Sequence, residues 1–245
     1  VVTAARADEI RVGPVPEAER ERLDLAGCYT RYARAAEGIP VVATDRVRPE
    51  AVAEAVWLID RMLAKRPDVA RAIARSPVRF VVMAHDEFTT DVPEHADLKP
   101  RAYWDKRARG LGATLARPAT SCGEENLLCF PGDPYAAENI LIHEFGHTIH
   151  EFGLAQADPT FQERLEAAFA LARENGRWKG TYAGTNVVEY WAEGVQGWFC
   201  CNRTRDHQHG EINSPEALRE YDPPLAALLE EVFGAEPWCY VRPQD

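Results

Sequence analysis

Apolar residues recur with two different periods along the first half of the chain. Between Pro49 and Pro67 they lie three or four positions apart, which predicts an amphipathic helix over residues 50–65. A run of β-branched residues over 78–84 predicts a buried strand, and residues 39–43 predict a second, shorter one. This half of the chain therefore combines strands with helices.

The segments that follow are shorter and less regular. Residues 88–106 are charged and contain two prolines, which predicts a loop. Residues 110–115 alternate small and apolar side chains and predict an edge strand, and residues 126–130 predict another short strand. An edge strand can receive an extended peptide through backbone hydrogen bonds.

Helical periodicity dominates the second half. The predicted helices cover residues 138–150, 158–175, 186–199, 216–221 and 224–233. A sheet-rich part over about residues 1–133, followed by a helical part over about 134–245, indicates an α+β fold. The sequence shows no internal repeat or linker, so we expect residues 1–245 to form a single domain.

Composition narrows the possible partners. With 46% hydrophobic residues, the chain of 245 residues can build a sizeable core. Its net charge of -11 argues against nucleic-acid binding, which requires clustered lysine and arginine. No apolar run approaches the ~18 residues that a membrane helix requires. We therefore expect neither a nucleic-acid nor a membrane partner.

One stretch of the helix predicted over 138–150 carries metal-binding chemistry. It reads His143-Glu144-Phe-Gly-His147, an H-E-x-x-H motif in apolar surroundings. Histidines four residues apart share one helical face, so both imidazoles can reach a single cation, and neutral imidazole suits zinc. Glu144 is placed to take a proton from water beside the metal. The alternative interpretation is a buried helix whose histidines only form hydrogen bonds.

A catalytic zinc site needs a third protein ligand. Metzincins continue the motif with a glycine and a histidine at positions that are occupied here by His150 and Gly153, which excludes that class. Glu166 follows His147 at the spacing of M1-type aminopeptidases, but its surroundings do not resemble that family. An exposed glutamate on a helix explains Glu166 equally well.

A second candidate lies within residues 182–193. Tyr182 is followed seven residues later by Glu189, and Glu193 follows within a Glu-aromatic-aromatic-Ala-Glu sequence. Together with the H-E-x-x-H motif, this stretch resembles the anthrax-lethal-factor-like gluzincins, which include the secreted Pro-Pro endopeptidases. The resemblance covers roughly residues 138–199, and the first 130 residues contain no motif that matches the family.

The resemblance implies a zincin-like fold, with zinc in a cleft between a sheet lobe and a helical lobe. The implied ligands of Zn²⁺ are His143, His147 and Glu189. The resemblance also implies that Glu144 is the general base, that the Tyr182 hydroxyl holds an oxyanion, and that Glu193 orients a ligand histidine. Two carboxylates four residues apart on an apolar helix are costly to bury unless a cation compensates them.

Other histidines fit ordinary structural roles. His85 and His95 lie in or near the predicted loop over 88–106, where a surface or packing role is expected. His207 and His209 lie in a polar stretch. They could hold a second ion, but a solvated loop is the preferred interpretation.

The six cysteines favour an oxidising compartment. They are Cys28, Cys122, Cys129, Cys200, Cys201 and Cys239, and none forms the C-x-x-C pair of a zinc knuckle. Cys122 and Cys129 flank a short loop and are the easiest pair to join, whereas the adjacent Cys200 and Cys201 should bond to different partners. We expect most of the six to be oxidised and the protein to be secreted. The alternative is a cytosolic enzyme with buried thiols.

These patterns together predict a zinc-dependent peptidase that hydrolyses peptide or protein substrates. One alternative is an aminopeptidase that uses Glu166 as the metal ligand. The other is a secreted binding or toxin module that keeps the fold without turnover. Glu144 argues against that module, because a structural zinc site needs no general base.

Overall fold

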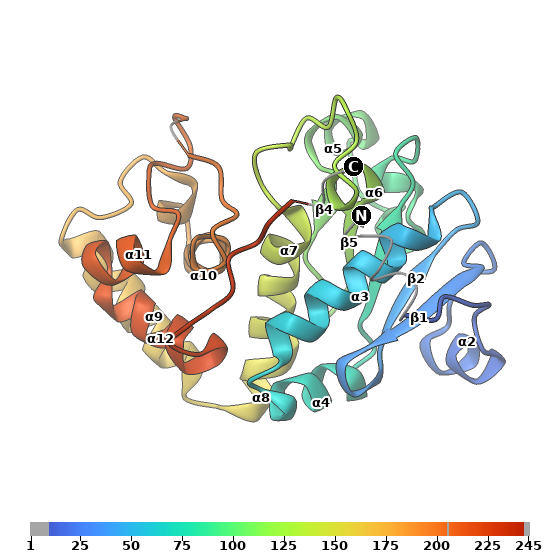
Figure 1. The fold of residues 1–245 in the computed structure, drawn as a ribbon, viewed down its shortest axis with the longest axis horizontal. Helices are drawn as coiled ribbons and strands as arrows, with labels where there is room; N and C mark the ends of the chain where they lie inside the picture. The colour runs from blue at the N-terminus through green and yellow to red at the C-terminus, as the bar shows by residue number, and fades with distance from the viewer. Residues whose placement is uncertain (1–9, 205, 243–245) are drawn as a thin grey trace.

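The computed structural model of the chain describes residues 10–204 and 206–242 (Figure 1). Among these residues, one sheet has the strand order β1-β2-β3-β5-β4. Its strands are β1 (Arg31–Ala35), β2 (Ile39–Ala43), β3 (Arg79–Met83), β4 (Gly110–Leu111) and β5 (Ala119–Gly123). Strands β2, β3 and β5 are parallel, whereas β1 and β4 pair antiparallel at the two edges.

Helices surround the sheet and continue beyond it. The helices of the first half are α2 (Glu17–Leu23), α3 (Pro49–Leu63), α4 (Pro67–Arg75), α5 (Arg101–Arg107) and α6 (Glu124–Leu127). Those of the second half are α7 (Ile140–Thr148), α8 (Ala155–Ala157), α9 (Phe161–Glu174), α10 (Val187–Trp198), α11 (Pro215–Tyr221) and α12 (Pro223–Phe233). In Figure 1, α9 to α12 gather on one side, and α7 runs between them and the sheet. The α+β prediction is confirmed.

Both faces of the sheet are covered, which explains why β3 is buried along its whole length and apolar after Arg79. On one face, Phe80 and Val82 belong to the main core beneath α3 and α7. On the other face, Val81 and Met83 join a smaller apolar cluster that includes Tyr29. Helix α7 packs against β5 and also against α10, so it links the sheet to the helical cluster.

The strand predicted over 126–130 is wrong. Residues there form α6 and the turn after it, and the strand of this region is β5, just upstream. The amide of Asn126 explains the difference, because its oxygen accepts a hydrogen bond from the backbone of Ile140 and its nitrogen donates to Asp133. The buried asparagine therefore ties α6 to the start of α7. The side chains of β5 are small and partly polar, so a search for apolar patterns does not predict this strand.

The loop predicted over 88–106 is also partly wrong, because α5 begins within it at Arg101 and two 3-10 turns precede it. Helix α5 buries no side chain and so shows no apolar period. Asp105 anchors it by accepting hydrogen bonds from the backbone and hydroxyl groups of Thr90. Contacts of this kind leave little trace in a sequence pattern.

The cysteines differ from expectation. One disulfide joins Cys200 to Cys239 and ties the segment after α12 to the end of α10. The other four cysteines are free thiols, so the prediction that most are oxidised is wrong. Cys122 is buried in β5 and Cys129 lies beyond α6, which separates the expected pair. Across the described ranges, no helix combines the length and apolar character needed to cross a bilayer.

Candidate metal centre

Helix α7 carries the H-E-x-x-H motif, and its start is fixed by a side chain. The Asn139 carboxamide accepts a hydrogen bond from the backbone NH of Ile142, as an N-cap does. The helix then continues as a π-helical segment, Ile149–Leu154. Regular α-helical geometry thus ends just after the second histidine of the motif. Such π segments often occur at functional sites.

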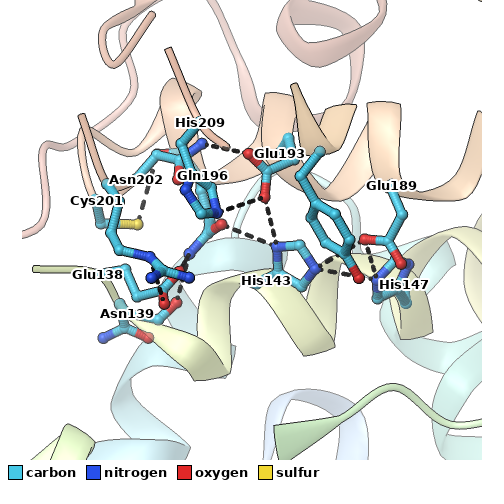
Figure 2. A network of polar contacts seen from close by, with 12 residues as sticks. Glu138, Asn139, His143, His147, Glu189, Glu193, Gln196, Cys201, Asn202 and His209 are labelled. Atoms are coloured by element: carbon cyan, nitrogen blue, oxygen red, sulfur yellow. Dashed lines mark hydrogen bonds and ion pairs between the residues drawn. The ribbon is translucent and has the colours of Figure 1, made fainter. Parts of the chain in front are cut away.

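Helix α10 lies against α7 and brings the two glutamates to the motif. Asn186 caps its first turn by accepting from the backbone NH groups of Val188 and Glu189. The indole of Trp191 donates to the carbonyl oxygen of Gly146, which fixes one helix against the other. Glu189 and Glu193, one turn apart, therefore face α7 (Figure 2).

Three potential ligand atoms meet between the two helices. The Nε2 atoms of His143 and His147 are 3.3 Å apart. The Glu189 Oε2 atom lies 3.2 Å from Nε2 of His143 and 3.5 Å from Nε2 of His147. A carboxylate oxygen of Glu144 is also close, since it lies within 4.8 Å of a ring nitrogen of each histidine. The group of His143, Glu144 and His147 is able to hold a metal ion.

Nε2 of His143, Nε2 of His147 and Oε2 of Glu189 form a triangle with the dimensions of a tetrahedral zinc site. Ligands about 2.0–2.1 Å from zinc at tetrahedral angles lie about 3.3 Å from one another. Two imidazole nitrogens and one carboxylate oxygen form a donor set that zinc accepts, with a fourth position left for water or substrate. The residues present therefore fit zinc, although other divalent metals use similar ligands.

The charges around His143 favour a cation. Burial opposes charge on its imidazole, but the hydrogen bond to Glu189 and the carboxylates of Glu144 and Glu193 raise the pKa of His143 to about 10. Burial also opposes ionisation of Glu189, yet its hydrogen bonds to His143 and His147 hold the pKa of Glu189 well below its usual range. The negative potential that retains a proton on His143 also attracts a metal ion.

The other ring nitrogen of His143 contacts two side chains of α10. Its Nδ1 lies 2.9 Å from Oε1 of Gln196 and 3.5 Å from Oε1 of Glu193. The predicted partner, Glu193, is thus the more distant one, and it accepts a hydrogen bond from Asn202. Sequence reasoning missed Gln196. Its position seven residues after Glu189 places it on the same helical face, which is the signal that could have found it.

Glu144 lies beneath the edge strand β4. A Cβ added to Gly110 would be 3.1 Å from Cγ of Glu144, and one added to Gly112 would be 2.9 Å from Cβ of His147. Gly110, in β4, and Gly112, just after it, therefore let this edge of the sheet pass directly over the motif. Burial raises the pKa of Glu144, while the two histidines oppose that shift. A carboxylate with a raised pKa suits the uptake and return of a proton near neutral pH.

A polar cavity of about 290 Å³ opens beside Glu144. Its lining includes residues 107–110, Tyr135, His143, Tyr182, Arg203 and His209. Arg203 forms an ion pair with Glu138 at 3.0 Å, so part of the charge in its wall is balanced. The cavity is large enough for a side chain of a bound peptide, next to the group that can hold a metal.

Tyr182 lies at this cavity, as the sequence predicts for a site residue. Its ring stacks on that of His143 with centroids 6.2 Å apart. Burial and the nearby Glu189 carboxylate raise the pKa of Tyr182 to about 12, against the opposing effect of Arg107. The hydroxyl therefore stays protonated at neutral pH and can donate a hydrogen bond; in this structure its partners are the Glu189 carboxylate and the Arg107 guanidinium.

The remaining candidates lie elsewhere. Glu166 is exposed on α9 and accepts a hydrogen bond from Gln162, which in turn contacts His150. His85 is largely exposed beside Glu124, and His95 is buried against the carbonyl oxygen of Ala119. None of these side chains reaches the Glu189 carboxylate.

The solvated-loop interpretation holds for His207 but is wrong for His209. His207 is exposed, whereas His209 is buried and only 4% accessible. The Nδ1 atom of His209 is 2.8 Å from the Asp206 carboxylate, and its Nε2 lies 3.9 Å from Glu193. The polar composition of this loop predicts an exposed histidine. His209 can be buried because the Asp206 carboxylate, three residues away, forms a hydrogen bond with its ring.

Comparison with known proteins adds no assignment to this geometry. No protein-family model matches the sequence, and no curated protein matches it significantly.

Proposed function

We propose that this protein is a zinc-dependent peptidase of the lethal-factor-like gluzincin type, with a zincin-like fold. The observation that carries the proposal is the triangle of His143, His147 and Glu189 beside Glu144. A structural metal site would have no use for a carboxylate with a raised pKa at this position. The adjacent edge strand supports a peptide as the substrate.

The proposed roles follow from the positions of the side chains. His143, His147 and Glu189 would hold the ion. Bound zinc would supply a Lewis acid that acidifies water and polarises a carbonyl group. Glu144 takes a proton from the attacking water and delivers one to the leaving amine. The Tyr182 hydroxyl donates a hydrogen bond to the oxyanion that forms as the carbonyl carbon becomes tetrahedral.

Substrate would bind as an added strand. Within the described part of the chain, β4 pairs with β5 alone, so its outer edge can accept backbone hydrogen bonds. Because Gly110 and Gly112 place β4 over Glu144 and His147, a peptide on that edge would cross the motif. We further propose that the protein works in an oxidising compartment outside the cytosol, which the Cys200–Cys239 disulfide supports.

Cleavage profiling on a diverse peptide library tests this function, with Glu144→Gln as the matched control. The amide cannot accept a proton but has nearly the same shape, so it should keep the metal and lose roughly 10²–10⁴ of the rate. The expected result is zinc-dependent cleavage by the wild type and almost none by the variant. Near-normal cleavage by the variant, or no cleavage by the zinc-loaded wild type, would contradict the proposal.

A further inference from the structure

Gln196 is a polar side chain enclosed within the packing of α7 against α10. It is fully buried among apolar and aromatic residues of α10. A buried carboxamide is costly unless its hydrogen bonds are satisfied, and this one is satisfied on both sides. Its oxygen faces His143, and its nitrogen faces the residues just before α7, as the network in Figure 2 shows.

The orientation of this carboxamide is fixed by groups that can only accept. Its Nε2 lies 3.1 Å from the carbonyl oxygen of Asn139 and 3.3 Å from a carboxylate oxygen of Glu138. Arg203 forms an ion pair with the Glu138 carboxylate at 3.0 Å. The nitrogen of Gln196 must therefore face these acceptors, and its oxygen must face His143.

This orientation determines which nitrogen of His143 carries hydrogen. Oε1 of Gln196, 2.9 Å from Nδ1, is an acceptor, so Nδ1 must donate. When the ring is neutral, as a metal ligand must be, its lone pair is then on Nε2, which faces Glu189 and His147, where the proposed metal would lie. Oε1 of Glu193 is farther from Nδ1, at 3.5 Å, while its Oε2 accepts from Asn202, so Gln196 is the nearer acceptor for the Nδ1 hydrogen.

We propose that Gln196 is a positioning residue that fixes the hydrogen of His143 on Nδ1 and thereby presents Nε2 to the metal. This inference deepens the proposed function, on whose zinc site it rests. It assigns the orienting role to a neutral amide, whereas the sequence assigns it to Glu193. The amide satisfies two acceptors near α7 that a carboxylate would repel.

The test replaces Gln196 with methionine, which has similar length and no amide. The Nδ1–H of His143 should lose its acceptor, and zinc affinity measured by chelator competition should fall about 10–100-fold. Gln162→Met is the matched control. The Oε1 atom of Gln162 lies 2.7 Å from Nε2 of His150, which is the same kind of contact, but this pair does not include a proposed ligand. The control should leave zinc affinity unchanged.

A second variant separates positioning from packing. Gln196→Glu keeps an acceptor for Nδ1–H but places a carboxylate against Glu138 and the Asn139 carbonyl. It should lower the melting temperature at least as much as Gln196→Met does, yet bind zinc more tightly than that variant. Equal zinc affinity in Gln196→Met and wild type would overturn the proposal. So would a loss of zinc affinity in the two variants that simply follows their loss of melting temperature.

Nuclear magnetic resonance gives a readout that does not depend on zinc binding. The His143 Nδ1–H should be detectable and slow to exchange with solvent in the wild type, with or without zinc, and fast in Gln196→Met. If the wild type binds no zinc, the proposed function fails while this measurement still tests Gln196. Rapid exchange of that hydrogen in the wild type would refute the positioning role.

Discussion

Tyr182 is the residue that most sharply separates the proposed chemistry from simple metal binding. Its hydroxyl is a donor at the cavity beside Glu144, and its ring rests on His143. If that hydroxyl meets the oxyanion only as the carbonyl carbon becomes tetrahedral, it stabilises the transition state and not the bound substrate. Its removal should then affect turnover and leave substrate binding almost intact.

Tyr182→Phe should lower kcat and kcat/KM together by roughly 10²–10³-fold, the usual effect of losing one oxyanion donor. Zinc content and KM should stay near those of the wild type, as steady-state kinetics and elemental analysis would show. Tyr103→Phe, which removes a hydroxyl from an exposed tyrosine of α5, is the control. A kcat that is unchanged in Tyr182→Phe would exclude the assigned role.

His95 makes the stability of the fold sensitive to acid. Burial lowers the pKa of His95, and its Nδ1 has no hydrogen-bond partner among the described residues. The folded state therefore keeps this imidazole neutral at a pH where the unfolded chain, with a pKa near 6.5, takes up a proton. The stability that this difference gives is present above about pH 6.5 and is lost as pH falls toward the folded pKa.

The free energy of unfolding should accordingly decrease below about pH 6.5, with up to about 1.4 kcal/mol per pH unit from this one group. His95→Gln should flatten that dependence, even if the variant is less stable at neutral pH. Urea unfolding at several pH values between about 8 and about 5 would measure both slopes. Identical slopes in the two proteins would show that His95 does not cause the effect.

At the scale of single residues, the sequence located the groups with recognisable spacing. His143, Glu144 and His147 came from a motif, and Glu189 came from a family resemblance. Gln196 escaped because glutamine is not a residue type associated with zinc chemistry. Its role depends on where its two amide atoms lie relative to Glu138 and to His143, which spacing alone does not show.

At the scale of elements, the close packing of β4 and the residues after it against α7 covers one side of the proposed site. Gly112 has no room for a side chain, since an added Cβ would lie 2.9 Å from Cβ of His147. Only a shift of strand or helix would accommodate it. Such a shift would move one of the proposed ligands, because His147 is the residue that the new atom would meet.

Gly112→Ala should therefore destabilise the protein by about 1–3 kcal/mol, as overpacking does, and weaken metal binding as well. Gly27→Ala is the matched control, because a Cβ there meets nothing within 4 Å. Chemical denaturation and chelator competition measure the two effects. If Gly112→Ala is as stable as Gly27→Ala and binds metal as tightly, the described contact between Gly112 and His147 is not close enough to matter.

The elements that the sequence predicts well are those with a continuous apolar face. Helices α3 and α10 and strand β3 begin and end close to their predicted bounds, because burial imposes a period on their residues. Strand β5 and helices α5 and α6 depend instead on hydrogen bonds to distant groups, such as that from the Ile140 backbone to Asn126. Such long-range partners cannot be read from a local pattern.

At the scale of the whole molecule, the proposed ligands come from both sides of one helix interface. His143 and His147 belong to α7, which rests on the sheet, and Glu189 belongs to α10, which belongs to the helical cluster. An ion held by all three would join the two parts of the fold. Binding to the folded state alone would also stabilise it, by an amount that grows with the logarithm of ion concentration.

The zinc content of the chain tests the central claim most directly. Protein stripped with a chelator, reloaded with zinc and freed of excess metal should contain about one zinc per chain by elemental analysis. Glu166→Ala should match the wild type, whereas Glu189→Ala should retain far less under the same dilution. A wild type that takes up no zinc, or a Glu189→Ala variant that keeps as much as the wild type, would contradict the proposed metal centre.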